Sequence, residues 1–227
     1  MGLKESGLRG SLRNVSVGID AIPDSAIAQY DATQESYADG ESFSTITDQI
    51  GDADMTGGSG EFTTSGINGN ASFDLNGFSS VFSADGNLII EDSFTCLTVV
   101  ELIDDDPQGR ILDRDAGNLS LYWNNGEKWQ FNDISGDDDP VVGSNDSSKQ
   151  LIGITKDGST NTIREDGVEM DSRSDTSTGG TTEPNIQGAN PWNGYIGEII
   201  FYEPVLSSSE LDSEEQRLAD KWGITLD

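Results

Sequence analysis

The sequence contains no histidine, and this absence excludes several kinds of functional site. None of the 227 residues is His. Histidine is the commonest general base and the commonest transition-metal ligand in proteins. A Ser-His-Asp triad, a Cys-His pair and a His-ligated zinc site are therefore excluded.

Cysteine is nearly absent as well. The single cysteine, Cys96, lies in the apolar run of residues 94–100 and cannot form an internal disulfide. A free cysteine in such a run behaves as a small hydrophobic side chain. We therefore expect Cys96 to be buried in a strand.

Positive charge is scarce. Only 12 Lys and Arg oppose 42 Asp and Glu, which gives a formal net charge of -30. Such a surface repels phosphate, so nucleic acid and anionic membranes are poor partners. At molar salt the Debye length falls to about 3 Å, and the repulsion among the acids is screened. The composition is typical of halophilic archaea that accumulate salt and of their viruses, with an extracellular calcium-rich adhesin as the alternative.

Long apolar segments are missing too. No run approaches the roughly 18 apolar residues of a membrane-spanning helix, and residues 1–13 lack the apolar stretch of a secretory signal. We expect no transmembrane segment and no signal peptide, hence either retention in the cell or release as part of a larger assembly.

The first 21 residues differ in charge from the rest of the chain. Lys4, Arg9 and Arg13 are three of the 12 cations, and glycines and leucines lie between them. We expect residues 1–21 to form a flexible anchoring arm that docks on a neighbouring subunit or an acidic partner surface. The alternative is a disordered tail.

Residues 22–227 show short strand-like runs separated by Asp-Gly and Asn-Gly turns, every 8 to 12 residues or so, as in β-sandwiches. We predict one all-β domain, an antiparallel jelly-roll β-sandwich, with residues 172–190 as a long polar loop. The expected strands are Ala26–Asp31, Ser42–Asp48, Ala71–Leu75, Phe94–Ile103, Gly109–Arg114, Leu119–Trp123, Lys128–Asn132, Gln150–Lys156, Thr160–Arg164 and Tyr195–Tyr202.

One short helix is predicted at the C-terminal end. Ser207 and Glu210 have the spacing of a capping box, and Gly223 is placed to end the helix. Leu218 and Trp222 fall on one face. We expect this face to pack against the sandwich.

The C-terminal region resembles a known family. Residues 194–207 read GYIGEIIFYEPVLS and residues 217–224 read RLADKWGI. This ending is similar to that of concanavalin A-like (laminin-G-like) jelly-roll domains, in which a G-x-I-x-E-I-I-x-Y strand leads into a short helix closing with L-x-x-K-W-G. The opening strands match more loosely, so the resemblance spans residues 24–226.

The resemblance implies a lectin-like sandwich and leaves the activity open. Glycanases of the family carry an E-x-D-x-x-E or E-x-D-x-E strand, since a retaining reaction needs two carboxylates about 5 to 5.5 Å apart. This chain offers Glu169 and Asp171 without a third acid at the matching offset. Glu198 matches an acid of the non-catalytic members, in which it holds structure. We therefore expect the chain not to be an enzyme.

Aromatic side chains beside amides are candidates for sugar binding, because sugar rings stack on aromatic faces and amides hydrogen-bond hydroxyls. Trp192 lies in a Pro/Asn/Gly segment, where we expect it to be exposed. Trp123 and Trp129 flank a hairpin turn, with core filling as the alternative. The candidate glycan-binding residues are Trp192, Asn190, Asn193, Trp123, Asn125 and Trp129.

Carboxylate clusters suggest an ion site. Asp137, Asp138 and Asp139 are the cluster we favour for Ca²⁺ or Mg²⁺, which prefer oxygen ligands. The alternative is a solvated loop. No other cofactor is expected.

Together these observations lead to one functional hypothesis. We expect a non-catalytic structural protein on the virion surface of a haloarchaeal virus, as a capsid turret, decoration or tail-fibre subunit. It would assemble in the host cytoplasm as a homo-oligomer with other virion proteins and contact host surface glycans. The alternatives are a secreted or cell-surface glycan-binding module of a haloarchaeon and a glycanase.

Overall fold

The computed structural model describes residues 22–78, 80–84, 86–91, 93–103, 109–113, 120–124, 128–132, 140–148, 150–174, 183–186 and 192–227. Its elements are β1 (Ala26–Asp31), β2 (Ser42–Ile46), β3 (Met55–Thr63), β4 (Ser72–Asp74), β5 (Phe82–Ser83), β6 (Ser93–Leu102), β7 (Gly109–Asp113), β8 (Ser120–Asn124), β9 (Lys128–Asn132), β10 (Val141–Val142), β11 (Leu151–Asp157), β12 (Thr160–Glu165), β13 (Val168–Ser174), β14 (Asn185–Ile186), β15 (Gly194–Tyr202) and α1 (Ser208–Trp222), with 3-10 turns at Ala32–Gln34 and Ile67–Gly69.

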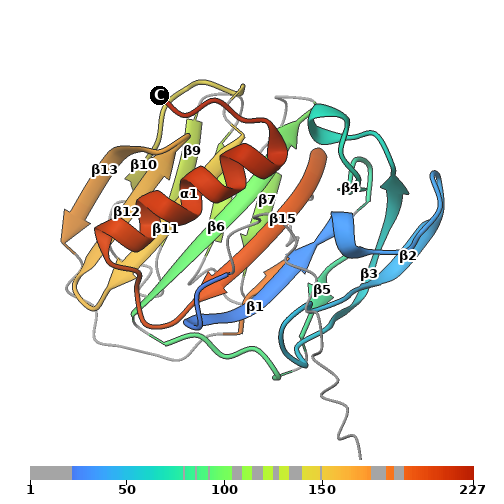
Figure 1. The fold of residues 1–227 in the computed structure, drawn as a ribbon, viewed down its shortest axis with the longest axis horizontal. Coiled ribbons are helices and arrows are strands. Elements are labelled where there is room, and N and C mark those ends of the chain that lie inside the picture. Colours follow the sequence, from blue (N-terminus) through green and yellow to red (C-terminus); the bar gives the residue numbers. More distant parts are fainter. Residues whose placement is uncertain are drawn as a thin grey trace, which may run out of the picture.

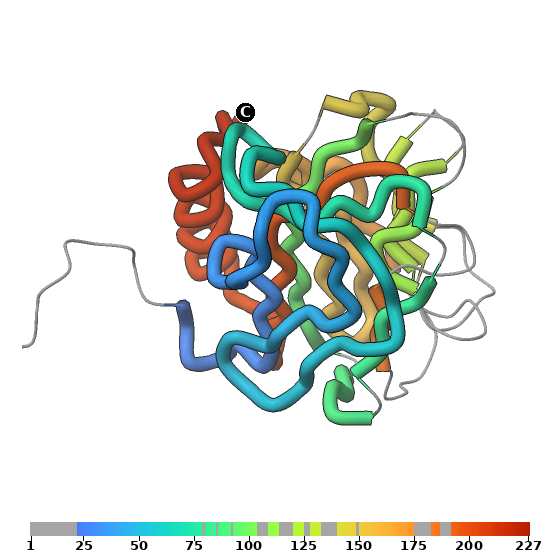
Figure 2. The backbone as a smooth tube through the Cα atoms, turned by 90° about the vertical axis from the view of Figure 1, so that its right-hand side faces the viewer, coloured from blue at the N-terminus to red at the C-terminus, as the bar shows by residue number. Residues whose placement is uncertain are grey.

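The strands form two layers joined into one continuous path. Its order is β10-β9-β8-β7-β14-β5-β3-β4-β15-β6-β11-β12-β13, with β1 beside β15 and β2 beside β3. The helix α1 covers the layer that contains β6, β11 and β15 (Figure 1). The strands β8 and β9 lie on the opposite side of the molecule from α1 (Figure 2). The predicted antiparallel all-β sandwich with a C-terminal helix is therefore confirmed.

Two apolar clusters hold these layers. The larger lies between the two sheet layers and includes the completely buried Phe94, Phe131 and Ile154. Cys96 belongs to it, as predicted, and burial raises the pKa of its thiol well above the usual value. The smaller cluster lies under α1 and contains Leu97, Leu218 and Trp222. Alternating side chains of β6 and β15 contribute to both clusters, because successive residues of a strand point to opposite faces.

The glycine-rich strand β3 was not predicted. A Cβ added to Gly58 would lie 2.2 Å from the Phe82 ring, and one added to Gly60 would lie 2.5 Å from the Phe43 ring. Glycine is therefore required here so that two core aromatic rings can pack against the strand.

A bulge in β15 sets the side chains that face α1. The pairing of β15 with β6 shifts between Ile196 and Glu198. The bulged residue, Gly197, leaves room for the indole of Trp222, which would lie 2.6 Å from an added Cβ. Glu198 thus points to the helix side, while Ile196 and Ile199 stay in the core between the layers.

Glu198 is the centre of a buried polar network. It is completely buried, and its carboxylate accepts hydrogen bonds from Gln29 Nε2 at 2.7 Å, Lys221 Nζ at 2.6 Å and Trp222 Nε1 at 2.8 Å. Lys221 Nζ also lies 2.6 Å from Asp31 Oδ2. One carboxylate therefore connects β15, β1 and α1, as the family resemblance implied for this acid.

The helix ends were also predicted correctly. The Ser207 backbone N–H donates to the Glu210 carboxylate at 2.9 Å, which completes the capping box. Gly223 follows the helix at φ 68°, in the left-handed conformation that glycine adopts without strain.

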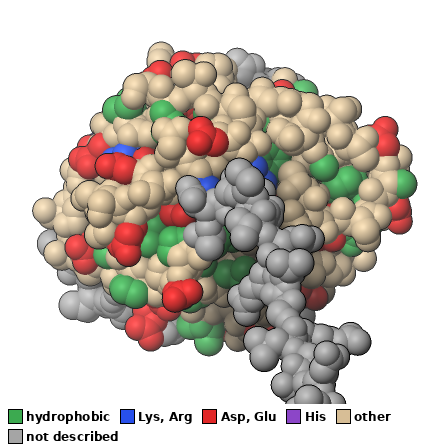
Figure 3. All heavy atoms as spheres, in the orientation of Figure 1, with side chains coloured by type: hydrophobic (Ala, Val, Ile, Leu, Met, Phe, Trp, Pro, Cys, Tyr) green, Lys and Arg blue, Asp and Glu red, His purple; other side chains and the backbone are tan. Residues whose placement is uncertain are grey.

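Acidic side chains are spread over the face that carries α1, and Lys and Arg show at few points (Figure 3). Within the ranges given above, no helix has the length and apolar character needed to cross a bilayer.

Replacing Glu198 with Gln should destabilise the protein strongly, because Lys221 and Arg217 would lose a buried counter-charge. We expect the free energy of unfolding to fall by about 3 to 5 kcal/mol, measured by denaturant unfolding at constant salt. Asp212→Asn is the control, since its 3.5 Å ion pair with Arg164 is exposed and worth less than about 1 kcal/mol. Equal effects of the two substitutions would contradict the structural role of Glu198.

Candidate functional site

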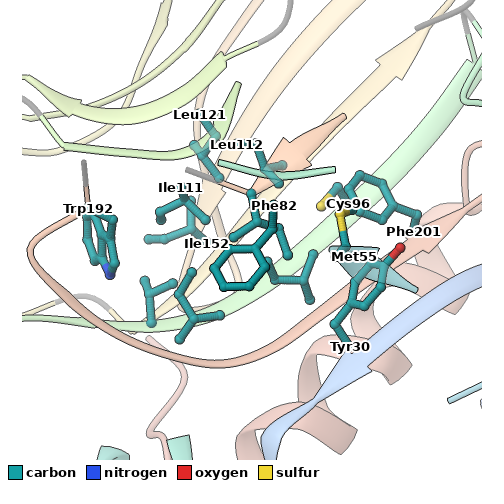
Figure 4. Close-up of a cluster of buried hydrophobic side chains, with 14 of the residues drawn as sticks. Tyr30, Met55, Phe82, Cys96, Ile111, Leu112, Leu121, Ile152, Trp192 and Phe201 are labelled. Atoms are coloured by element: carbon teal, nitrogen blue, oxygen red, sulfur yellow. The ribbon is translucent and has the colours of Figure 1, made fainter. Parts of the chain in front are cut away.

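The three tryptophans proposed for sugar stacking lie in the core. Trp129 and Trp192 have no exposed surface, and Trp123 is 1% exposed. Their ring centroids lie 5.5 Å apart for Trp123–Trp129 and 5.6 Å apart for Trp129–Trp192. Figure 4 places Trp192 in the same buried cluster as Ile111 and Ile152. The expected exposure of Trp192 is therefore wrong, and the core alternative holds for Trp123 and Trp129.

Burial of Trp192 has a local cause. Its indole N–H donates to the Tyr195 carbonyl at 3.4 Å. Gly194 lies so close to this ring that an added Cβ would be 2.9 Å from the indole nitrogen. The short segment before β15 thus folds the ring back onto the core instead of presenting it to solvent.

The other predicted site residues are only partly covered by the structure. Asn193 is half-buried, and its carbonyl accepts a hydrogen bond from the Ile103 N–H at 3.0 Å. Asn125, Asn190, the Asp137–Asp139 cluster and the arm residues Lys4, Arg9 and Arg13 lie outside the described residues. Within the described ranges, no three His, Cys, Asp or Glu residues are placed to share a metal ion. A Ca²⁺ or Mg²⁺ site at Asp137–Asp139 stays a prediction.

The two acids closest to a glycanase motif do not form a pair. The register of β12 and β13 shifts so that Ile163 faces Asp171 while Arg164 faces Glu169. Ile163 belongs to the core between the layers, whereas Arg164 contacts α1. Since paired residues of antiparallel strands point to the same face, Glu169 and Asp171 point to opposite faces. Asp171 instead accepts the Val142 backbone N–H at 3.0 Å.

The outer face of β7, β8 and β9 carries a row of polar side chains, which we call the β7–β9 face. Arg110 pairs with Tyr122, and Tyr122 pairs with Gln130, so the three side chains lie in line across three strands. Alternation along the same strands adds Ser120 and Asn124 from β8 and Lys128 and Asn132 from β9.

These side chains bind one another. The Tyr122 hydroxyl donates to Gln130 Oε1 at 2.5 Å and accepts from Asn132 Nδ2 at 3.2 Å. The Arg110 guanidinium carbon lies 5.8 Å from the Tyr122 ring centre, and one of its nitrogens lies 2.6 Å from Asp113 Oδ1. The guanidinium is therefore held in place by a ring and a carboxylate together.

Two buried polar atoms of this face have no hydrogen-bond partner. Ser120 is 1% exposed, and its hydroxyl oxygen makes no hydrogen bond. Arg110 Nε is also buried without a hydrogen-bond partner. Leaving a buried polar group unpaired costs about 1 to 3 kcal/mol. Tyr122 and Gln130, at 6% and 8% exposed, form the buried layer, while Asn124, Lys128 and Asn132 are half-buried. A polar ligand on this face would meet the half-buried side chains, and the row formed by the buried Tyr122 and Gln130 lies between them.

A second polar surface lies under the first half of α1. This groove has a volume of about 290 Å³ and is lined by residues that include Thr160, Thr162 and Asp212. Its one arginine, Arg164, is already bound to Glu215 at 2.7 Å, and this hydrogen bond is the main cause of its raised pKa. The described residues that line the groove include no amide side chain, whereas the β7–β9 face has several, so the groove is less suited to a sugar.

Sequence reasoning missed the residues of the β7–β9 face. The signal was the alternation in SLYWN and KWQFN, which puts Tyr122 and Trp123 on opposite faces. If the tryptophans had been assigned to the core, the same alternation would have placed Tyr122, Gln130 and Asn132 outside.

Solved structures share this fold, although neither a protein-family model nor a curated protein matches the chain. Trypanosoma rangeli sialidase has a TM-score of 0.61 at 16% identity, over 91% of this chain and 35% of its own. Its complex with sialic acid gives 0.61 at 15% identity, over 91% and 35%. The binding domain of botulinum neurotoxin DC in complex with SialylT gives 0.57 at 11% identity, over 86% and 51%. The chain thus spans about a third of the sialidase and about half of the toxin domain.

At these identities the comparison shows the fold alone. It is an antiparallel β-sandwich fold that is also present in a sialidase and in a toxin binding domain solved with SialylT. Our prediction that the chain is not an enzyme is contradicted, because the sialidases that share its fold are enzymes.

Replacing Trp192 with Ala should destabilise the folded protein. Removing a large buried ring leaves a cavity, so we expect the free energy of unfolding to fall by about 3 to 5 kcal/mol. Ile103→Ala is the control, since Ile103 is 44% exposed and should change stability by no more than about 0.5 kcal/mol. An unfolding midpoint that does not move in the Trp192 variant would show that the ring is not part of the core.

Proposed function

We propose that the chain is a carbohydrate-binding β-sandwich that holds its glycan on the β7–β9 face. The observation that carries this proposal is the hydrogen-bonded set of Tyr122, Gln130 and Asn132, with the unpartnered Ser120 hydroxyl on the same face. The shared fold with a sialidase and with a toxin binding domain solved with SialylT supports it.

The chemistry of this face suits sugars. Amide side chains both donate and accept hydrogen bonds, as sugar hydroxyls do. Asn124 and Asn132 lie at the two ends of the face and are half-buried, so they can reach a ligand while keeping fixed positions. Tyr122 acts as a positioning residue, because its hydroxyl joins Gln130 to Asn132.

The test is binding of the full chain to a panel of glycans at about 2 to 3 M salt, where charge repulsion is screened. Asn124→Ala combined with Asn132→Ala should weaken binding at least about tenfold, since each lost hydrogen bond contributes about 1 kcal/mol. The matched control is Thr160→Ala with Thr162→Ala in the groove under α1. Loss of binding in the control pair alone would refute the assignment to the β7–β9 face.

For the biological setting, we propose a virion surface protein of a halophilic host, in which the sandwich contacts host glycans. The support is the net charge of -30 and the basic segment with Lys4, Arg9 and Arg13. In this setting residues 1–21 dock on other virion proteins or on further copies of the chain, as a homo-oligomer.

The anchoring proposal is tested by measuring the molar mass of the protein in solution. Light scattering in about 2 to 3 M salt should give a discrete oligomer for the full chain. The variant with Lys4, Arg9 and Arg13 changed to Ser should be a monomer, since it lacks the basic contacts. A full chain that is monomeric, or an oligomer that persists in the variant, would overturn the anchoring role of these residues.

A further inference from the structure

Most Lys and Arg side chains of the described residues form ion pairs with carboxylates. Arg164 is paired with Glu215, Arg173 with Asp171, Arg217 with Glu214, and Lys221 with Asp31 and Glu198. Lys156 is completely buried. The other two described cations are Arg110, which has one ion pair with Asp113, and Lys128, and both lie on the β7–β9 face. In a chain with a net charge of -30, two cations on one face with at most one carboxylate contact between them require an explanation.

Arg110 is only partly neutralised. Its ion pair with Asp113 uses one terminal nitrogen, at 2.6 Å, and Nε has no hydrogen-bond partner. The Tyr122 ring, 5.8 Å from the guanidinium carbon, holds the group in position. Its side chain is 22% exposed. A planar guanidinium with free donors is suited to an oxyanion such as a carboxylate.

Lys128 is the freer of the two. Among the described residues it has neither a hydrogen bond nor an ion pair from its side chain, and it is half-buried opposite Asn124. It lies two strands and one side-chain row from Arg110, which strand geometry converts to about 12 Å between the two Cα atoms. At this backbone spacing the two side chains can each hold a separate anionic group. Two anionic groups on successive sugars could contact one cation each.

From these contacts we propose that the glycan of the β7–β9 face is an acidic oligosaccharide, whose carboxylate or sulfate groups are bound by Arg110 and Lys128. The inference rests on the proposed glycan-binding function and adds the class of ligand. Asn124, between the two cations, and Asn132 then contact the sugar hydroxyls. Tyr122 supports Arg110 from below.

The experiment compares matched polymers on the full chain at about 1 M salt, where the Debye length is about 3 Å and the overall charge is screened. Oligogalacturonate carries one carboxylate per sugar, and its methyl ester has the same sugar without charge. Dextran sulfate and dextran form the corresponding sulfate pair. Binding is measured by calorimetry.

At least one acidic polymer should bind ten or more times as tightly as its neutral partner. Arg110→Gln and Lys128→Gln should each reduce this preference at least threefold, and Arg173→Gln on β13 should leave it unchanged. Unfolding midpoints of all variants show whether a loss of preference comes from misfolding. If Arg110→Gln is destabilised, Arg110→Lys replaces it, because lysine keeps the positive charge but lacks the planar guanidinium. Preference for the oligogalacturonate identifies carboxylate as the bound group, and preference for dextran sulfate identifies sulfate.

Equal binding of an acidic polymer and its neutral counterpart, or binding of neutral glycans alone, would overturn this inference. Either result would leave the glycan-binding function intact. If no glycan of the panel binds, the proposed function itself fails. A preference that survives both Arg110→Gln and Lys128→Gln would show that other groups recognise the charge.

Discussion

The buried carboxylate of Glu198 is the interaction on which the architecture depends. It lies on the helix side of β15 and binds Gln29 of β1 together with Lys221 and Trp222 of α1. Burying an isolated charge is very costly, but here each partner is fixed and the carboxylate is fully hydrogen-bonded. Glu214 extends this network, because its carboxylate pairs with Arg217 and accepts a hydrogen bond from the Tyr202 hydroxyl. Burial and the Glu214 carboxylate raise the pKa of Tyr202. The C-terminal helix is thereby fixed on one sheet layer, and the β7–β9 layer remains on the opposite side.

Much of this fold could be predicted from local signals in the sequence. The Asp-Gly and Asn-Gly turns located most long strands, with β1 and β9 matching to the residue, and the capping box and Gly223 gave the ends of α1. The strand β3, which was not predicted, reads MTGGSGEFT. Its glycines leave space for the rings of Phe43 and Phe82, which come from other strands. Residues 172–174 were expected in a loop but belong to β13. Such elements depend on contacts between distant residues, which no local pattern carries.

The candidate site was harder to predict for a related reason. Trp192 follows a Pro/Asn/Gly segment that is typical of exposed loops, yet its ring packs against Trp129 in the core. Tyr122 and Gln130 were not predicted as site residues, because the neighbouring Trp123 and Trp129 match the pattern of sugar-stacking rings beside amides. Which of two alternating sets faces outward depends on the second sheet layer, so it is known only from the assembled sandwich. Charge patterning has the same limit, since Arg164 and Lys221 pair with acids that lie on other elements of the fold.

Hydrogen–deuterium exchange with and without a bound glycan tests the central claim most directly, since it locates the ligand without any substitution. The full chain is compared alone and saturated with the tightest-binding glycan of the panel, at one salt concentration. The account predicts slower exchange in the strands that carry Tyr122 and Gln130, with no change in α1 or β12. Protection confined to α1 and β12, around the groove that contains Thr162, would contradict it.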